Sequence, residues 1–144
     1  MPQPERRELR WVSPQGFLSA NVWEWLPAQP DPSAPPVLCV HGLTRNGRDF
    51  DVLARALAAR GRRVLCPDLP GRGLSEPLRA PIHYQPQTYT TMLVTLLAWE
   101  KEVDWVGTSL GGILGMLVGV LAGNPIRRLV LNDIGPFVSA AAVG

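Results

Sequence analysis

The chain has 144 residues, which allows one domain of ordinary size and leaves no room for two. Hydrophobic residues make up 46% of the sequence and charged residues 18%, which excludes a disordered, charge-rich chain. The net charge of +2 is spread along the chain without the dense basic cluster that grips a phosphate backbone, so we expect no nucleic-acid partner.

The N-terminal segment and the two cysteines bear on the cellular compartment. Residues 1–9 are expected to be flexible, and no apolar stretch follows them that could serve as the core of a signal peptide. A cytoplasmic protein is therefore expected. Cys39 and Cys66 each lie inside a short apolar run, which favours buried, reduced thiols over a disulfide framework or a metal site.

Strand and helix patterns alternate along the chain. Residues 10–12 and 18–25 predict an antiparallel hairpin, and a proline-rich connection follows it. Short apolar runs at 37–40, 64–66 and 129–131 are typical of buried strands, and residues 103–107 are expected to form a further buried strand between them. Helical spacing of apolar residues predicts helices from Asp49 to Arg60, over 86–97 and over 109–123. This order indicates an α/β fold with a mostly parallel, doubly wound sheet and an N-terminal antiparallel hairpin.

Residues 105–126 carry no charge, and the segment is long enough to span a bilayer. Its glycines, together with Asn124 and Pro125, make it a poor lipid-facing helix, and no basic cluster flanks its start. Small residues on one face equally suit a helix pressed against a sheet. We therefore expect a soluble fold with no membrane partner, and a membrane-associated helix stays as a distant alternative.

The sequence Gly107-Thr108-Ser109-Leu110-Gly111 fits the pattern Gly-x-Ser-x-Gly, at the point where a predicted strand turns into a predicted helix. The glycines permit a tight turn that forces Ser109 into a strained conformation with its hydroxyl exposed. The helix start also places backbone N–H groups and the positive end of the helix dipole beside a developing oxyanion. The motif predicts Ser109 as a nucleophile, and the alternative is a glycine-rich turn with a capping serine.

Two other motifs precede this one, each directly after a predicted buried strand. They are His41-Gly42 and Asp68-Leu69-Pro70-Gly71-Arg72-Gly73-Leu74-Ser75. With the three motifs in this order, the sequence from about Gly16 onward resembles the α/β-hydrolase family, and within it the serine esterases and carbon–carbon bond hydrolases.

The resemblance implies a site and a reaction. The backbone N–H groups of Leu43 and Leu110 would form the oxyanion hole. The residues that would shape the loop and the elbow around it are His41, Gly42, Gly107 and Gly111. The implied reaction is hydrolysis of a small ester or related carbonyl substrate through an acyl-enzyme on Ser109, without a metal or organic cofactor. A serine nucleophile points away from haloalkane dehalogenases and epoxide hydrolases, which need a carboxylate.

Several polar side chains near these motifs allow two interpretations. His41 is expected to shape its loop instead of acting as the base, because the family order is Ser, acid, His. Asp68 either holds its own loop through hydrogen bonds or acts as an acid near the site. Arg72 and Ser75 belong to the loop or to the rim of the pocket. His83 is a solvated loop residue or faces the substrate cleft.

No histidine follows Ser109 in the sequence, so the usual triad order is not completed. Asp133 is a candidate for the catalytic acid, and the alternative is a structural carboxylate at the end of the last strand. The resemblance implies that residues 1–144 form a single, incomplete domain, the N-terminal half of a truncated α/β-hydrolase fold. The alternative function is an inactive remnant or a partner-binding half-domain. The oligomeric state cannot be derived from the sequence.

Overall fold

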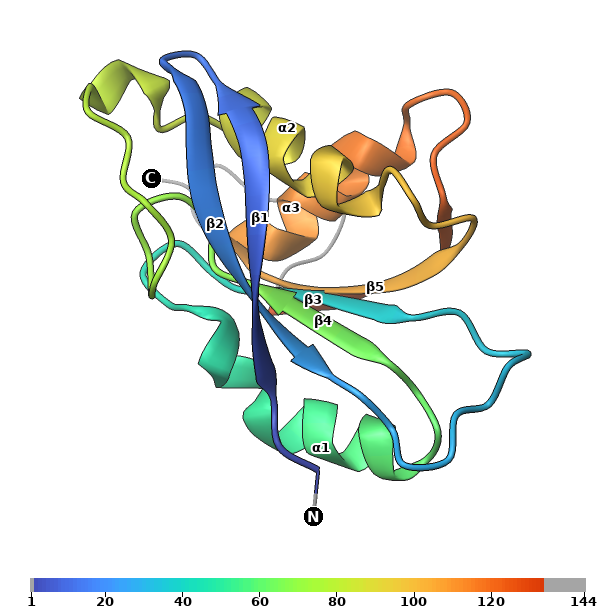
Figure 1. The fold of residues 1–144 in the computed structure, drawn as a ribbon. Helices are drawn as coiled ribbons and strands as arrows, with labels where there is room; N and C mark the ends of the chain where they lie inside the picture. Colours follow the sequence, from blue (N-terminus) through green and yellow to red (C-terminus); the bar gives the residue numbers. More distant parts are fainter. Residues whose placement is uncertain (1, 134–144) are drawn as a thin grey trace.

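The computed structural model describes residues 2–133, which form a six-stranded sheet with helices on both faces (Figure 1). The strands are β1 (Glu5–Ser13), β2 (Gly16–Trp25), β3 (Val37–Val40), β4 (Val64–Pro67), β5 (Val103–Thr108) and β6 (Ile126–Asn132). The helical elements are η1 (Gly47–Phe50), α1 (Asp51–Ala59), η2 (Pro81–His83), α2 (Pro86–Leu97) and α3 (Leu110–Gly119).

The strand order in the sheet is β1-β2-β4-β3-β5-β6. β3 lies between β4 and β5 and is parallel to both, and β5 pairs with β6 in parallel as well. β1 and β2 form the antiparallel hairpin, and β2 joins the sheet antiparallel to β4. The predicted mostly parallel sheet with an N-terminal antiparallel hairpin is confirmed.

Two cores lie on opposite faces of the sheet. α1 covers one face, whereas α2 and α3 cover the other, where β1 of the twisted hairpin also contacts α2 (Figure 1). The larger core lies under α2 and α3 and contains Trp11 and Trp105. The smaller one lies under α1 and contains Trp25 and both cysteines. Burial on both faces explains why β3 and β4 read as unbroken apolar runs in the sequence.

The first strand begins at Glu5, so the prediction of a flexible segment over residues 1–9 is wrong for residues 5–9. Cross-strand partners explain the difference. The Arg6 Nε donates to the Asn21 side-chain oxygen at 3.0 Å, and Arg7 forms an ion pair with the buried carboxylate of Glu24. The charged residues at 5–8 therefore belong to an edge strand, in which charged side chains still have cross-strand partners.

Two side chains set helix ends differently from the sequence prediction. Asp49 is not a cap, because Asn46 accepts a hydrogen bond from the Arg48 N–H at 2.9 Å and starts η1 ahead of α1. At the other end of the chain, α3 stops at Gly119 and β6 starts at Ile126. Asn124 causes both changes, since its amide donates to the Gly119 carbonyl at 3.0 Å and accepts from the Ile126 N–H at 3.0 Å.

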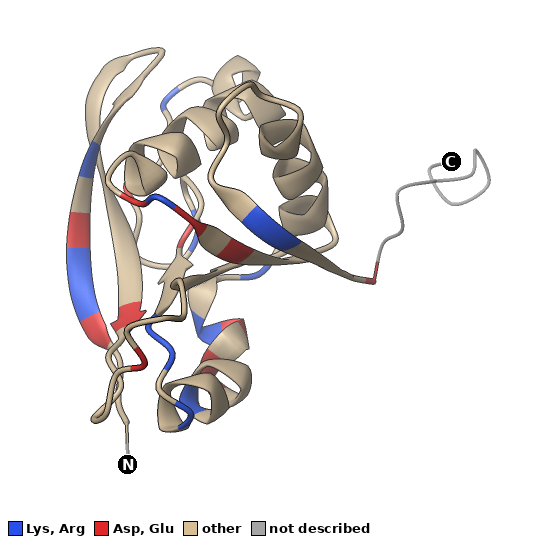
Figure 2. Ribbon diagram, turned by 90° about the vertical axis from the view of Figure 1, so that its right-hand side faces the viewer, with Lys and Arg blue, Asp and Glu red and all other residues tan. Residues whose placement is uncertain are grey.

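The uncharged segment 105–126 folds into most of β5, the whole of α3 and the first residue of β6. Figure 2 shows α2 and α3 as helices without charged residues. Within residues 2–133, no helix combines the length and the apolar character needed to cross a bilayer.

Candidate active site

Ser109 occupies a strained turn between β5 and α3. Its backbone has φ 51° and ψ −113°, a conformation that residues with a Cβ atom rarely adopt, and the residue is exposed. The turn lies at the carboxyl ends of the parallel strands, the edge where open α/β sheets bind their ligands. The predicted exposed serine in a tight strand-to-helix turn is therefore present.

Glycines make this turn possible because α3 starts in close contact with two strands. A Cβ atom on Gly107 would lie 2.4 Å from the Gly111 carbonyl oxygen. A Cβ atom on Gly111 would lie 2.0 Å from the carbonyl oxygen of Val40 at the end of β3. No larger side chain fits at either position without moving the helix.

The loop after β3 lies directly beside this elbow. A Cβ atom on Gly42 would be 3.6 Å from the Ser109 Cβ atom. The Gly42 carbonyl accepts a hydrogen bond from the Arg45 N–H at 3.1 Å, which closes a tight turn around Leu43. Within residues 2–133, the backbone N–H groups of Leu43 and Leu110 have no hydrogen-bond acceptor. Two free donors therefore lie in the loop and the elbow that meet at Ser109.

His41 holds this loop through both of its ring nitrogens. Nε2 accepts a hydrogen bond from the Leu69 N–H at 2.9 Å, so the proton of the neutral ring is on Nδ1. Nδ1 then donates to the Gly42 carbonyl at 2.7 Å. Because the N–H of Leu43 belongs to the same peptide unit as that carbonyl, His41 fixes the direction in which this N–H points. Burial lowers the pKa of His41 and keeps the ring neutral.

Asp68 connects three segments below the site. Its Oδ1 accepts from the Gly47 N–H at 2.7 Å, and its Oδ2 accepts from the Leu74 N–H and the Asn21 amide, both at 3.0 Å. A Cβ atom on Gly73 would lie 2.3 Å from Oδ2, which explains the glycine there. The interpretation of Asp68 as the residue that holds its own loop is confirmed.

Arg72 and Ser75 are also loop residues with defined partners. The Arg72 Nε donates to the Leu43 carbonyl at 3.0 Å, so the loop after β4 is tied to the loop after β3. The Arg72 guanidinium also lies 5.1 Å from the centre of the Tyr89 ring. Ser75 Oγ donates to the Asp68 carbonyl at 2.6 Å. No local sequence pattern indicates the contact between Arg72 and Leu43, because the fold alone brings these two residues together.

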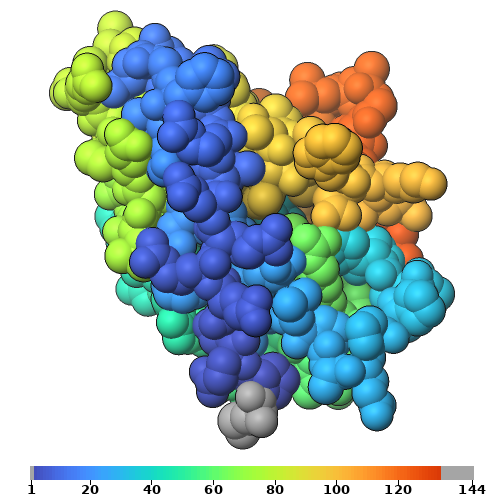
Figure 3. Space-filling model, in the orientation of Figure 1, coloured from blue at the N-terminus to red at the C-terminus, as the bar shows by residue number. Residues whose placement is uncertain are grey.

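His83 and Asp133, the two remaining candidate residues, lie in different parts of the fold. His83 lies in η2, next to the tip of the hairpin, where the Arg79 N–H donates to the Gln15 side chain at 2.7 Å (Figures 1 and 3). Asp133 directly follows Asn132, whose carbonyl accepts the Ser109 N–H at 3.1 Å. The structure thus brings the backbone of Asp133 next to the elbow and leaves His83 with the hairpin.

A hollow of about 750 Å³ opens beside the elbow, between α1 and the last two strands. Thr108 and Asn132 line it at the strand ends, and Val52, Leu53 and Val130 line its apolar part. Val52 is 81% exposed and Val130 is 52% exposed. Within residues 2–133, the hollow included, no group of three His, Cys, Asp or Glu side chains is placed to hold a metal ion.

Known proteins match both the sequence and the fold. Residues 35–142 match the family described as alpha/beta hydrolase fold. A 3-hydroxybutyrate-oligomer hydrolase from Cupriavidus necator is 46% identical over 92% of this chain and 44% of its own length. A human serine hydrolase-like protein is 30% identical over 88% of this chain and 60% of its own length.

Solved structures agree with these sequence matches. An alpha/beta hydrolase from Novosphingobium aromaticivorans superimposes with a TM-score of 0.82 at 42% identity, over 98% of this chain and 48% of that protein. The chain therefore spans about half the length of such relatives. The chain belongs to the α/β-hydrolase fold family.

Proposed function

We propose that the protein is a serine hydrolase in which Ser109 attacks the carbonyl carbon of a small ester. The observation that carries this proposal is the conformation of Ser109, at φ 51° and ψ −113° on an exposed turn between β5 and α3. Backbone strain of this kind costs about 1–3 kcal/mol and persists only where the surrounding structure imposes it. Glycines at 107 and 111 allow the surrounding strands to impose it here.

The unpartnered N–H groups support the same reaction. When Ser109 Oγ bonds to the carbonyl carbon, the carbonyl oxygen gains negative charge, and the N–H groups of Leu43 and Leu110 would donate to it. Collapse of this intermediate breaks the bond to the alcohol, which leaves with a proton, and the acyl group stays on Ser109. Water then repeats the attack, releases the acid and restores the hydroxyl group.

The substrate class that we propose is a short hydroxyalkanoate ester. The relative with 46% identity over 92% of this chain is a 3-hydroxybutyrate-oligomer hydrolase, and a match of that length spans residues 41–111, where the three motifs lie. A serine at position 109 sets the chain apart from mechanisms that need a carboxylate nucleophile.

The base for this reaction is not His41, because both of its ring nitrogens already bind backbone groups. His83 lies in η2 beside the hairpin tip. Asp133 remains our candidate for the acid, with the structural carboxylate at the strand end as the alternative. Its positive φ of 60° and its exposed position at the end of β6 are compatible with either role.

Labelling with a fluorophosphonate tests the nucleophile directly, since the probe forms a covalent bond with an activated serine. We expect mass spectrometry to find one adduct on Ser109 of the 144-residue chain, formed faster as the pH rises from 7 to 10. Ser109→Ala should remove the adduct. Ser33→Ala is the matched control, because Ser33 is an exposed serine whose hydroxyl binds Asp31 at 2.7 Å, and labelling should persist. Absence of an adduct at every pH would contradict the proposal.

A second candidate function is a non-catalytic half-domain that binds a partner protein. The exposed apolar lining of the hollow between α1 and β6 favours it, because such surface is usually covered in a stable protein. The labelling experiment separates the two candidates. An unlabelled Ser109 combined with normal folding would favour the half-domain.

A further inference from the structure

We propose that Trp105 is a positioning residue for the elbow that carries Ser109, an inference that rests on the function proposed above. Trp105 lies in β5 and is fully buried. Its indole N–H donates to the carbonyl oxygen of Gly111 at 3.0 Å. This bond connects the strand that precedes Ser109 with the first turn of the helix that follows it.

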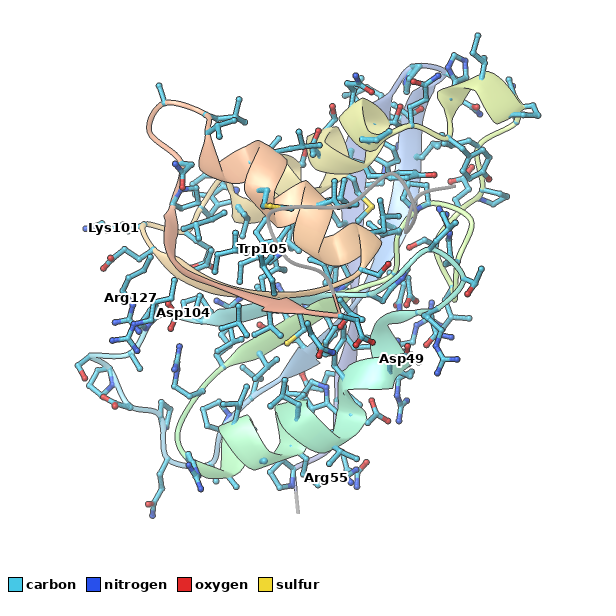
Figure 4. The ribbon with its side chains drawn as sticks, turned by 180° about the vertical axis from the view of Figure 1, so that it is seen from behind. Asp49, Arg55, Lys101, Asp104, Trp105 and Arg127 are labelled. Atoms are coloured by element: carbon cyan, nitrogen blue, oxygen red, sulfur yellow. The ribbon has the colours of Figure 1, made fainter. Side chains whose placement is uncertain are left out.

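The helix has no side chain of its own at the place where the indole lies. A Cβ atom on Gly115 would be 2.8 Å from the Trp105 Nε1 atom and 2.7 Å from the Leu129 Cδ1 atom. Gly111 and Gly115 are one helical turn apart and therefore face the sheet together. Figure 4 shows Trp105 between the sheet and α3. The indole ring thus determines how closely α3 packs on β5.

The first turn of α3 is fixed from two sides. The backbone of Gly111 is in close contact with the Val40 carbonyl at the end of β3, and the Gly111 carbonyl is held by Trp105. Loss of the indole N–H would release one of these two contacts. The first turn would then be free to shift, and both the Ser109 side chain and the Leu110 N–H would shift with it. A displacement of about 1 Å at a reacting group lowers rates by up to about a hundredfold.

Trp25 provides a matched control. It is also a fully buried tryptophan of the same sheet, in β2, but its indole N–H has no hydrogen-bond partner within residues 2–133. Replacement by phenylalanine removes the same atoms at both positions. Only Trp105→Phe also removes a hydrogen bond.

The experiment measures the reactivity of a thiol placed at position 109, because that reaction needs no catalytic base. In a Ser109→Cys variant, the thiol lies at the start of α3, and the helix dipole lowers a thiol pKa below its ordinary value of about 8.5. The rate of reaction with Ellman's reagent between pH 6 and 10 gives this pKa. Cys39 and Cys66 are fully buried, so the wild-type chain supplies the blank.

With Trp105→Phe added, we expect the reaction at pH 7 to slow about tenfold and the thiol pKa to rise, whereas Trp25→Phe changes the rate less than about twofold. Both variants are compared without denaturant, and as long as both are folded, a general loss of stability does not change the measured rate. Equal rates in the two variants would overturn the inference. Benzothienylalanine at position 105 keeps the ring shape and lacks only the N–H, so it provides the same comparison if Trp105→Phe does not fold.

Fluorophosphonate labelling of the otherwise wild-type chain keeps the two proposals apart. If Ser109 is labelled and both phenylalanine variants react alike, the role of Trp105 fails and the proposed function stands. If Ser109 is never labelled and the thiol still responds only to Trp105→Phe, the proposed function fails and Trp105 still positions the elbow.

Discussion

Gly111→Ala is expected to destabilise the protein strongly, although alanine ordinarily stabilises a helix. The added Cβ atom would lie 2.0 Å from the Val40 carbonyl oxygen, and ordinary van der Waals contact begins at 3.4 Å. α3 would have to move away from β3 by about 1.4 Å to restore that contact. Overpacking of a buried contact costs about 1–3 kcal/mol and occasionally more, and this displacement belongs to the upper end of that range.

Gly119→Ala in the same helix is the matched control. Its Cβ atom would meet only the Ile126 Cδ1 atom, at 3.9 Å, so the intrinsic preference of helices for alanine should raise stability by up to about 1 kcal/mol. The two variants should therefore differ by about 3 kcal/mol in the free energy of unfolding, measured by urea denaturation. With a slope of about 1–3 kcal/mol per molar urea, the midpoints should lie at least about 1 M apart. Equal stabilisation by both substitutions would refute the close approach of α3 to β3.

Three other predictions concern strain and protonation. Ser109→Gly should raise the free energy of unfolding by about 1–3 kcal/mol, because glycine adopts positive φ without strain. The same substitution should abolish fluorophosphonate labelling. An unchanged free energy of unfolding in urea would contradict strain at Ser109. The pKa of His41 is lowered by burial, so the unfolded chain binds more protons than the folded one below about pH 6.5. Stability should be constant above that pH and fall below it by at most about 1.4 kcal/mol per pH unit, and urea midpoints of His41→Gln should lack this slope. The hydrogen bond with Cys39 and burial raise the pKa of Cys66, so Ellman's reagent at pH 8 should modify neither thiol in the folded wild-type chain and both in urea.

Local patterns explain what could be predicted from the sequence. The strands β3 and β4 are short apolar runs bounded by turn residues, and the elbow is a contiguous motif, so these features can be identified without knowledge of distant residues. The strand over residues 5–9 was missed because its charges are stabilised by partners on β2, such as Glu24. The end of α3 was missed because one side chain, Asn124, both stops the helix and starts the next strand.

The supporting contacts of the candidate site depend on the fold and have weaker sequence signals. The glycines at 111, 115, 119 and 123 repeat every fourth residue, which is typical of a closely packed helix, either in a membrane or against a sheet. Only Gly111 and Gly115 meet a close neighbour, because α3 ends at Gly119 and a Cβ atom on Gly123 would meet nothing. The tryptophan at 105 gives no such sign, since its partner can be identified only once α3 is placed over β5.

The buried polar side chains near Ser109 have hydrogen-bond partners in the surrounding loops, whereas three polar groups at the elbow and the adjoining loop do not. His41 uses both ring nitrogens for backbone groups, and the carboxylate of Asp68 accepts three hydrogen bonds. Among the groups at the elbow and the adjoining loop, those without a hydrogen-bond partner within residues 2–133 are the Ser109 hydroxyl and the N–H groups of Leu43 and Leu110. This part of the chain therefore offers a nucleophile and donors for an oxyanion, but no acceptor for the serine proton. When residues 2–133 act alone, hydroxide has to remove the proton of the Ser109 hydroxyl. The labelling rate should then rise about tenfold per pH unit. A rate that instead levels off near neutral pH would show that a titrating base outside these residues reaches Ser109.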